Sequence, residues 1–467
     1  MKTSSILFVA MSALASLTEA RRGCKPDVAH PGFGTYTIAS GDNLNDIATD
    51  FGTTATQLAT INSIPNPDQI KPGNTLVDSA EDWRHEASTM QDVYRNAYIG
   101  IGALGAKDDE GGCFFERDPA KAGPTVLSSK MEPDGKMMNF MLYQEELWSW
   151  RYIFEHEPLC QRSWIVQERL LAPRTLYFGS KQVFWECRAR ACCEMHPKGM
   201  DPCQGAAEKA PTEKVWKQLL ATNHNKHGLS HRHQVFFEWD VIVEHYANLQ
   251  LTRASDKLVA LSGLANDTQK KLNEWQPGPH RYLAGLWEDE LIRQLTWFVK
   301  GPAKRASQYR APSWSWACLD GKVRLGTMVS TSGESFDLAS MISAEMVYPS
   351  KEETGEVKSG ILTLKGPCLW AKLLLDKAGR TSATASPLPT LEAHVMFDTL
   401  NDVTDEALLF WTYYDTGFYD DFHVRGLVLA LTGNDRYRRL GIMSSGSVWK
   451  QDLKLIKALP QIQVRII

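Results

Sequence analysis

Cysteine and histidine side chains crowd one short stretch of the sequence, and residues of these types can bind zinc. The set comprises Cys187, Cys192, Cys193, His196 and Cys203. Structural zinc sites usually draw two ligands from a C-x2-C pair, and this stretch contains no such pair. If the chain is exported, a disulfide among these cysteines is an equally good interpretation. We therefore expect no metal site here.

Three glycines follow the spacing of a dinucleotide-binding loop. Gly100, Gly102 and Gly105 match the pattern G-x-G-x-x-G, which holds a pyrophosphate between a strand and a helix. Here the glycines fall within an expected strand, and the acidic run that follows them would repel a pyrophosphate. A plain turn is the preferred interpretation, and we expect no cofactor.

Two further groups of side chains could supply acid–base or metal chemistry. Four carboxylates lie close together in the sequence, as in a glycosidase, but a solvated helix face is the simpler explanation. Four histidines share a polar segment, where a solvated loop is the simpler explanation. These residues are Glu145, Glu146, Glu155 and Glu157, and His224, His227, His231 and His233. The sequence assigns no catalytic residue, and we expect a protein that is not an enzyme.

The N-terminus has the pattern of a signal peptide. Lys2 precedes an apolar run from Ile6 to Leu17, and small residues lead to an expected cleavage after Ala20. The run is too short to span a membrane, and no longer apolar run follows. We expect residues 1–20 to direct export, with no membrane span.

Composition excludes some partners and leaves one conflict about location. The net charge of -4 gives the chain no general attraction to nucleic acid. The 467 residues suffice for two or three domains. The 9 cysteines are an odd number without framework spacing, which does not fit a disulfide-built secreted domain. Asn266-Asp267-Thr268 is the only N-glycosylation sequon, and it matters only on the secretory route.

A small module at residues 33–78 must position the first candidate site. Residues 35–39 alternate and are β-prone, which predicts a strand. Apolar residues from Leu44 onward recur at helical spacing, and Thr54 can begin a second helix. Residues 75–77 predict a second strand. The predicted order is strand, helix, helix, strand.

This module resembles the LysM family. The resemblance rests on the run YTIASGDNLNDIATDFGTTATQLATIN and on the closing IPNPDQIKPGNTL. The preceding CKPDVAHPGFG is similar to the lead-in of fungal secreted LysM effectors. The family resemblance implies binding of N-acetylglucosamine polymers, chitin above all. It places them in a shallow groove between the loop after the first strand and the loop before the second.

The resemblance implies that these two loops form the carbohydrate-binding site. Backbone groups at the turns would bond acetamido groups, and Leu44, Pro67 and Ile70 would contact the N-acetyl methyl and the sugar face. Asp42 as a helix cap and Gly73 as a turn residue are equally good structural interpretations of those positions. The family often has Thr or Ser in place of Asn43. The expected site residues are Ser40, Gly41, Asp42, Asn43, Leu44, Asn66, Pro67, Asp68, Gln69 and Ile70.

The chain from residue 79 resembles a second family, the fungal HET (heterokaryon incompatibility) proteins. The matching blocks are Trp83-Arg84-His85-Glu86, Tyr94-Arg95-Asn96-Ala97, Arg162-Ser163-Trp164, Gln167-Glu168 and Phe184-Trp185-Glu186-Cys187. The resemblance implies a TIR-related α/β fold linked to programmed cell death. The family's two opening strands are absent, and their loss would leave unpaired sheet edges. We expect a partial HET-like domain at residues 79–210, to which no catalytic residue is transferred.

The remaining chain changes character once more. We expect residues 211–330 to be mainly helical and residues 331–467 to be β-rich, as an antiparallel sheet or sandwich. The whole is then an α+β multidomain chain.

The sequence favours an exported, effector-like protein that binds chitin or chito-oligosaccharides through its single LysM module. One alternative is an intracellular HET-type protein of cell death and nonself recognition. Another is a chimera of two coding regions with a non-functional HET part. The sequence does not indicate an oligomeric state.

Overall fold

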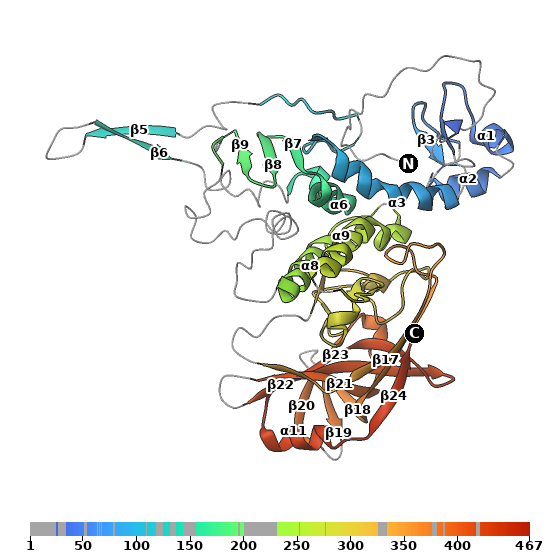
Figure 1. Cartoon of the computed structure of the whole chain (residues 1–467), viewed down its shortest axis with the longest axis vertical. Helices are drawn as coiled ribbons and strands as arrows, with labels where there is room; N and C mark the ends of the chain where they lie inside the picture. The colour runs from blue at the N-terminus through green and yellow to red at the C-terminus, as the bar shows by residue number, and fades with distance from the viewer. Residues whose placement is uncertain are drawn as a thin grey trace. The chain divides into compact units, whose positions relative to one another are not determined.

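The computed structural model of the chain forms two compact units, Met1–Gln218 and Leu219–Ile467. Figure 1 shows their elements. The structure describes residues 25–26, 34–50, 54–62, 64, 66, 68–77, 80–108, 110–117, 125–130, 137–142, 156–194, 197–199, 231–251, 253–275, 277–325, 334–375, 381–385, 388–416 and 421–467. The expected signal peptide at residues 1–20 lies outside them.

The N-terminal module contains the predicted order of strand, helix, helix and strand. Its elements are β1 (Lys25–Pro26), β2 (Gly34–Thr37), α1 (Leu44–Asp50), α2 (Ala55–Ile61) and β3 (Thr75–Val77). The strands form one antiparallel sheet in the order β1-β2-β3. Its core consists of Ile38, Leu44, Ile47, Ala48, Leu58, Ala59 and Leu76. The module therefore encloses a hydrophobic cluster of its own.

The described residues in the rest of the first unit form a small sheet and two helices. The helices are α3 (Ala80–Asn96) and α6 (Trp164–Leu171), and the strands are β4 (Gly100–Gly102), β7 (Arg174–Phe178), β8 (Val183–Cys187) and β9 (Ala191–Cys193). The sheet order is β4-β7-β8-β9, with β4 parallel to β7. A separate hairpin joins β5 (Thr125–Lys130) to β6 (Met137–Leu142). Among the described residues β4 pairs only with β7, which leaves the open edge that the missing family strands predict.

The second unit begins with two helices and continues as short strand pairs. The helices are α8 (His231–Ala247) and α9 (Val259–Trp275). The expectation of a mainly helical region up to residue 330 is wrong beyond Trp275. There the chain forms the pairs β10 (Tyr282–Leu283) with β11 (Leu286–Trp287), β12 (Phe298–Val299) with β15 (Val323–Arg324), and β13 (Lys304–Arg305) with β14 (Leu319–Asp320), besides α10 (Leu291–Gln294).

Buried aromatic rings explain this irregular path. Trp239, Tyr282 and Trp287 meet edge to face, with ring centroids 5.2 to 5.6 Å apart. The indole nitrogens of Trp239 and Trp316 both donate to the Gly285 carbonyl, at 3.3 and 3.1 Å. Because the indole N–H groups of Trp239 and Trp316 need an acceptor as well as apolar contact, short turns around these rings replace a regular helix.

The C-terminal strands close into a barrel rather than forming an open sheet or sandwich. Six strands pair in a ring: β18 (Ser359–Leu375), β21 (Glu406–Thr416), β22 (Phe422–Gly433), β23 (Arg436–Val448), β20 (Leu388–Phe397) and β19 (Thr381–Ala385), which returns to β18. All six pairings are antiparallel. Closure removes the open edges that a flat sheet would present. The length of β18 allows it, because its second half pairs with β19 and β21.

Short elements complete the barrel. They are β16 (Ser335–Asp337) on β21, β17 (Ser340–Val347) on β18, β24 (Gln461–Ile466) on β18 and β23, and the helix α11 (Lys450–Lys457). Leu453 and Ile456 of α11 belong to the same hydrophobic cluster as Trp411 and Val428 of the barrel strands. The helix is therefore part of the barrel core.

Arg439, which forms a buried ion pair with Asp398, joins the segment that contains Trp297 to the barrel. Arg439 of β23 donates from Nε and Nη2 to the Asp398 carboxylate, both at 3.0 Å. Its guanidinium lies 3.4 Å from the centroid of the Trp297 ring and donates to the Leu295 and Trp297 carbonyls. Four of the five N–H donors of this arginine are thus used inside the second unit.

Candidate functional site

The two loops expected to bind sugar lie side by side at one end of the N-terminal sheet. The Ile38 amide donates to the Asn74 carbonyl, and the Gly73 amide donates to the Ile38 carbonyl, both at 2.8 Å. These bonds continue the pairing of β2 with β3 beyond Thr37 and Thr75. The loop after β2 and the loop before β3 therefore form one continuous rim.

Asp42 holds the first loop in shape. Its Oδ2 accepts from the Tyr36 hydroxyl at 2.5 Å and from the Ala39 amide at 2.7 Å. The Asp42 amide in turn donates to the Ala39 carbonyl at 3.2 Å. Gly41 completes the turn with a φ of 94°, a conformation that glycine adopts without steric cost. Tyr36 was not among the predicted site residues. Its only signal in the sequence was its position in a predicted strand, next to the turn.

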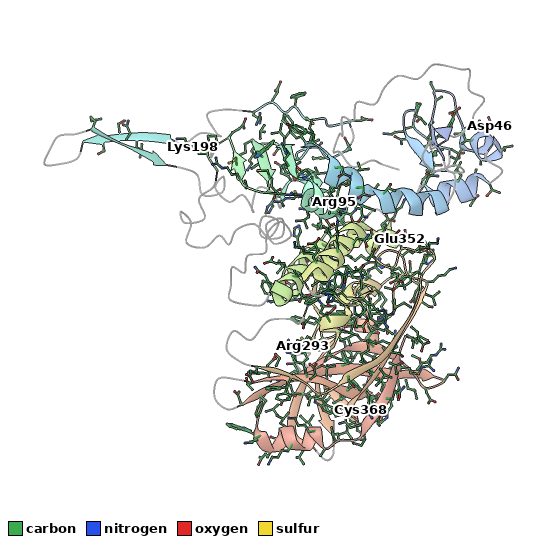
Figure 2. All side chains as sticks on the ribbon, viewed as in Figure 1. Asp46, Arg95, Lys198, Arg293, Glu352 and Cys368 are labelled. Atoms are coloured by element: carbon green, nitrogen blue, oxygen red, sulfur yellow. The ribbon has the colours of Figure 1, made fainter. Side chains whose placement is uncertain are left out.

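Asn43, rather than Asp42, caps helix α1. The Asp46 amide donates to Asn43 Oδ1 at 2.9 Å, and Asn43 Nδ2 donates to Asp46 Oδ2 at 2.6 Å. Asp46 lies in the first turn of α1 (Figure 2). The expectation that Asp42 serves as the helix cap is therefore wrong. Because Asn caps helices as well as Ser or Thr does, the departure from the family's usual residue keeps this function.

The second loop is built in the same way around Asn66. The Asp68 amide donates to Asn66 Oδ1 at 3.1 Å, and the Gln69 amide donates to the Asn66 carbonyl at 3.0 Å. Gly73 ends the loop with a φ of 88°. Pro67 lies outside the described residues. The side chain of Asn66 thus shapes the turn, while Asp68 and Gln69 are exposed on it.

The expected apolar contacts differ from the structure. Leu44 is only 2% exposed and belongs to the module core, so its side chain offers no surface to a sugar. Its position as the first residue of α1 turns it inward, because the helix buries that face. Ile70 is half-buried and packs against the same core. Ser40, Gly41, Asp68 and Gln69 remain exposed on the rim.

Polar residues on and around helix α6 and strands β7 and β8 serve the interior of the first unit. Arg169 Nε donates to Glu186 Oε2 at 2.7 Å, and both side chains are buried. Burial and the nearby Glu186 carboxylate raise the pKa of Tyr177 well above its usual value. Ser180 donates from its amide and its hydroxyl to Glu157 Oε1, at 2.9 and 2.8 Å. These contacts join α6 to the sheet and hold the turn between β7 and β8.

The other chemical patterns of the sequence take structural roles. Gly100 and Gly102 lie in β4, where an added Cβ would come within 3.1 Å of Thr175 and 2.6 Å of Tyr177. Close packing against β7 therefore requires these glycines, and among the described residues no helix follows them directly. Cys187 Sγ accepts from the Arg190 amide at 3.4 Å, Cys192 is partly exposed and Cys193 is buried. His196 and Cys203 lie outside the described residues, within which no cluster fit for a metal occurs.

The carboxylate and histidine groups are described only in part. Glu145, Glu146 and Glu155 lie outside the described residues, as do His224 and His227. The Glu157 side chain is buried and accepts hydrogen bonds from Ser180, as described above. In the part of the chain that the structure describes, no helix is both long enough and apolar enough to cross a membrane.

Two adjacent segments of the first unit match the models of different families. Residues 36–77 match the LysM domain, and residues 77–168 match the heterokaryon incompatibility protein (HET) family. The two matches meet at Val77. The chain is also similar to the secreted LysM effector Vd2LysM of Verticillium dahliae, at 54% identity over 44 residues. That alignment covers 9% of this chain and 30% of the effector. No solved structure matches the chain.

Proposed function

We propose that the chain is an exported protein that binds chitin or related N-acetylglucosamine oligomers through residues 36–77. The observation that carries this proposal is the single rim formed by the two loops, within a segment that matches the LysM domain. Similarity to a secreted LysM effector supports both glycan binding and export.

The rim offers the groups that an acetylated sugar needs. Ser40, Asp68 and Gln69 present polar side chains, and no partner for these side chains occurs among the described residues. Gly41 and Gly73 have open space where a Cβ would lie, so a ligand can approach the backbone there. Asp42, Asn43 and Asn66 instead fix the loops before any ligand arrives, which lowers the entropy cost of binding.

Binding to chitin beads tests this role with the full-length chain. We expect the double variant Ser40→Ala/Gln69→Ala to lose most retention, because it removes rim hydrogen bonds without touching the core. Thr49→Ala, on the exposed side of α1, is the matched control and should bind as the wild type does. Soluble chito-oligomers should release the wild type. Failure of the wild-type chain to bind, or of oligomers to compete, would contradict the proposal.

A second candidate function is an intracellular role in cell death. The HET match over residues 77–168 favours it. Expression of residues 21–467 in the cytosol of a fungal host tests it. Loss of viability would support this role, and normal growth at equal protein level would count against it.

The junction between the two matches also needs a test at the level of the gene. Strand β3 ends at Val77 and helix α3 begins at Ala80, with no Gly- or Pro-rich linker between them. A single transcript spanning the codons of Thr75 and Arg84 would show that one gene product carries both segments. Two separate transcripts would show a chimera.

A further inference from the structure

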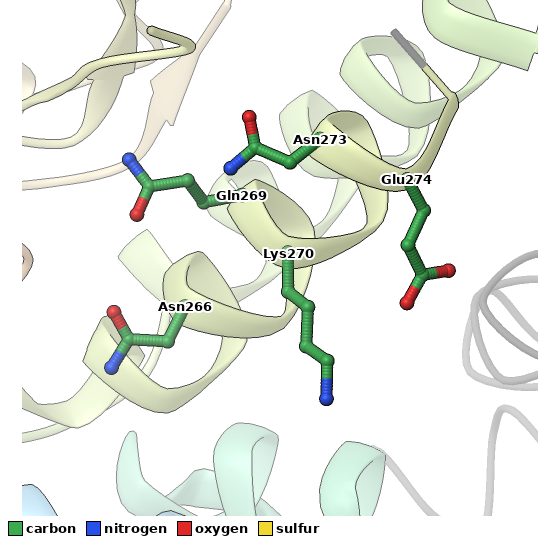
Figure 3. A pocket seen from close by; sticks show the side chains of 5 residues that line it. All are labelled: Asn266, Gln269, Lys270, Asn273 and Glu274. Carbon is green, nitrogen blue, oxygen red and sulfur yellow. The ribbon is translucent and has the colours of Figure 1, made fainter. Parts of the chain in front are cut away.

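The sequon Asn266-Asp267-Thr268 lies within helix α9, one face of which is polar and open. Asn266 is partly exposed and borders an open hollow of about 490 Å³. The other residues along this face are Gln269, Lys270, Asn273 and Glu274 (Figure 3). A sugar attached at Asn266 would therefore meet a polar surface with room beside it.

The contacts of Asn266 are compatible with an attached sugar. Its amide oxygen Oδ1 accepts from the Thr354 hydroxyl at 2.9 Å. An N-linked glycan is joined through the amide nitrogen Nδ2, so the oxygen remains an acceptor after attachment. The bond to Thr354 is therefore compatible with the modification.

Thr268 limits when the modification can take place. Its side chain is 0% exposed, and its hydroxyl donates to the Leu264 carbonyl at 2.7 Å. The sequon is recognised through this hydroxyl, which the folded helix hides. Attachment must therefore precede the folding of α9, and the folded protein is no longer a substrate.

We propose that Asn266 carries an N-linked glycan when the chain passes through the secretory pathway. In this step Nδ2 of Asn266 forms a bond to the anomeric carbon of N-acetylglucosamine. The bond from that carbon to the pyrophosphate of a lipid-linked oligosaccharide breaks, the amide loses a proton, and the lipid pyrophosphate leaves. The proposal rests on the export proposed above, and it assigns the second unit to the lumen of that pathway.

Neighbouring side chains can then hold the first sugar. Asn273 and Lys270 follow Asn266 at the spacing of one helix face and carry hydrogen-bond donors for hydroxyl and acetamido oxygens. Gln269 is already engaged through Nε2 with the His280 carbonyl at 2.9 Å. The sugar would thus lie along the helix rather than against the segment that contains His280.

Secretion of the full-length chain from a fungal host tests the proposal. Cells and medium are assayed for the chain, with and without an enzyme that removes N-glycans. The wild type and Thr268→Ser, which keeps both the sequon and a hydroxyl, should show one mobility step on treatment. Asn266→Gln and Thr268→Val should show none, and peptide mass spectrometry should find Asn266 converted to Asp only in the first two.

The outcomes test the glycan site and the export of the chain separately. If the chain appears in the medium with unmodified Asn266, the proposed glycan site is wrong and the proposed export holds. A chain held in cells that carries the glycan supports the site and overturns release. A chain in cells without the glycan overturns both. A glycan that can be added to the purified folded protein would contradict the requirement that attachment precede folding.

Discussion

Asn43 and Asp46 cap helix α1 reciprocally. The Asp46 amide donates to Asn43 Oδ1 at 2.9 Å, while Asn43 Nδ2 donates to Asp46 Oδ2 at 2.6 Å. Asn43 ends the first rim loop, so the same residue that begins the helix also fixes the position of the proposed sugar site. Stability and binding should therefore respond together to changes at this position.

Replacement of Asn43 tests this coupling. Asn43→Ala should lower the free energy of unfolding of the N-terminal module by about 1 kcal/mol, because the cap is lost. Asn43→Ser keeps a capping oxygen and should be nearly neutral. Chemical denaturation of the module measures the difference. An equal loss in both variants would show that the amide acts in some way other than capping.

Asp42 should matter through its two hydrogen bonds. Asp42→Ala removes the acceptor of both Tyr36 and Ala39, and we expect a loss of roughly 2 kcal/mol in the unfolding free energy. Tyr36→Phe removes only one of these bonds and should lose about half as much. Chitin retention should fall in the same order. A Tyr36→Phe variant that binds less well than Asp42→Ala would contradict this account.

The buried pair of Arg439 and Asp398 should be a major support of the second unit. Arg439→Met removes both direct hydrogen bonds to the buried Asp398 carboxylate and leaves it only the ion pair with Arg305 at 3.5 Å, which should cost about 3–5 kcal/mol. The double variant Arg439→Met/Asp398→Asn should recover part of this loss, because it removes the buried charge. Arg439→Lys should not, since an ammonium cannot bond both carboxylate oxygens in the same plane. Thermal unfolding measures all three, and equal losses for the single and double variants would contradict the argument.

Asp240 should make the second unit less stable as the pH rises. One carboxylate oxygen accepts from Gln294 Nε2 at 2.8 Å, and the other is buried without a partner among the described residues. Burial raises the pKa of Asp240 well above its usual value, and the nearby Glu244 and Glu290 add to the effect. The folded state therefore holds a proton that the unfolded state releases above about pH 4.

The variant Asp240→Asn should be more stable than the wild type at neutral pH and similar to it near pH 4. The gap should grow by up to about 1.4 kcal/mol per pH unit until the pKa of the folded state is reached. Urea unfolding across that range measures the gap. A constant difference between the two proteins at every pH would contradict a protonated Asp240.

Lys257 should have the opposite pH dependence in the alkaline range. Burial, followed by the charge of Arg310, lowers the pKa of Lys257 to about 8. The unfolded chain then binds more protons than the folded one between about pH 8 and about pH 10.5, so stability rises with pH across this window. Lys257→Met should remove the slope. Lys257 Nζ lies 5.5 Å from the centroid of the Tyr246 ring, so Tyr246→Phe, which keeps this ring, should keep the rise between about pH 8 and about pH 10.

The elements of the N-terminal module were predictable because its signals are local. Turn glycines, a helix-starting polar residue and apolar spacing lie within a few residues of one another, and they predicted β2, α1, α2 and β3 in order. The roles of single residues were harder. Asp42 and Asn43 are both good caps by type, and only the backbone path after Gly41 decides that Asn43 takes the position.

Contacts between distant residues lay beyond the sequence. The apolar side chain of Leu44 could face a sugar or the core, and only packing against residues such as Leu58 and Leu76 turns it inward. Closure of the C-terminal strands into a barrel depends on β18 pairing with both β19 and β21, which local alternation cannot reveal. The buried pair of Arg439 and Asp398 could not be predicted for the same reason, because 41 positions separate the two residues in the sequence.

The sequence by itself thus determined the secondary structure of the N-terminal module and its family resemblance. It also determined the position, near Val77, of the boundary between the two resembled families. All of these depend on neighbours along the chain. The tertiary structure decided which loop residues face solvent, which glycines serve close packing and which charged groups are paired, because burial depends on residues far apart in the sequence. The same rule explains Asn266 and Thr268: the sequence marks them as one sequon, and the fold exposes the first while it buries the second.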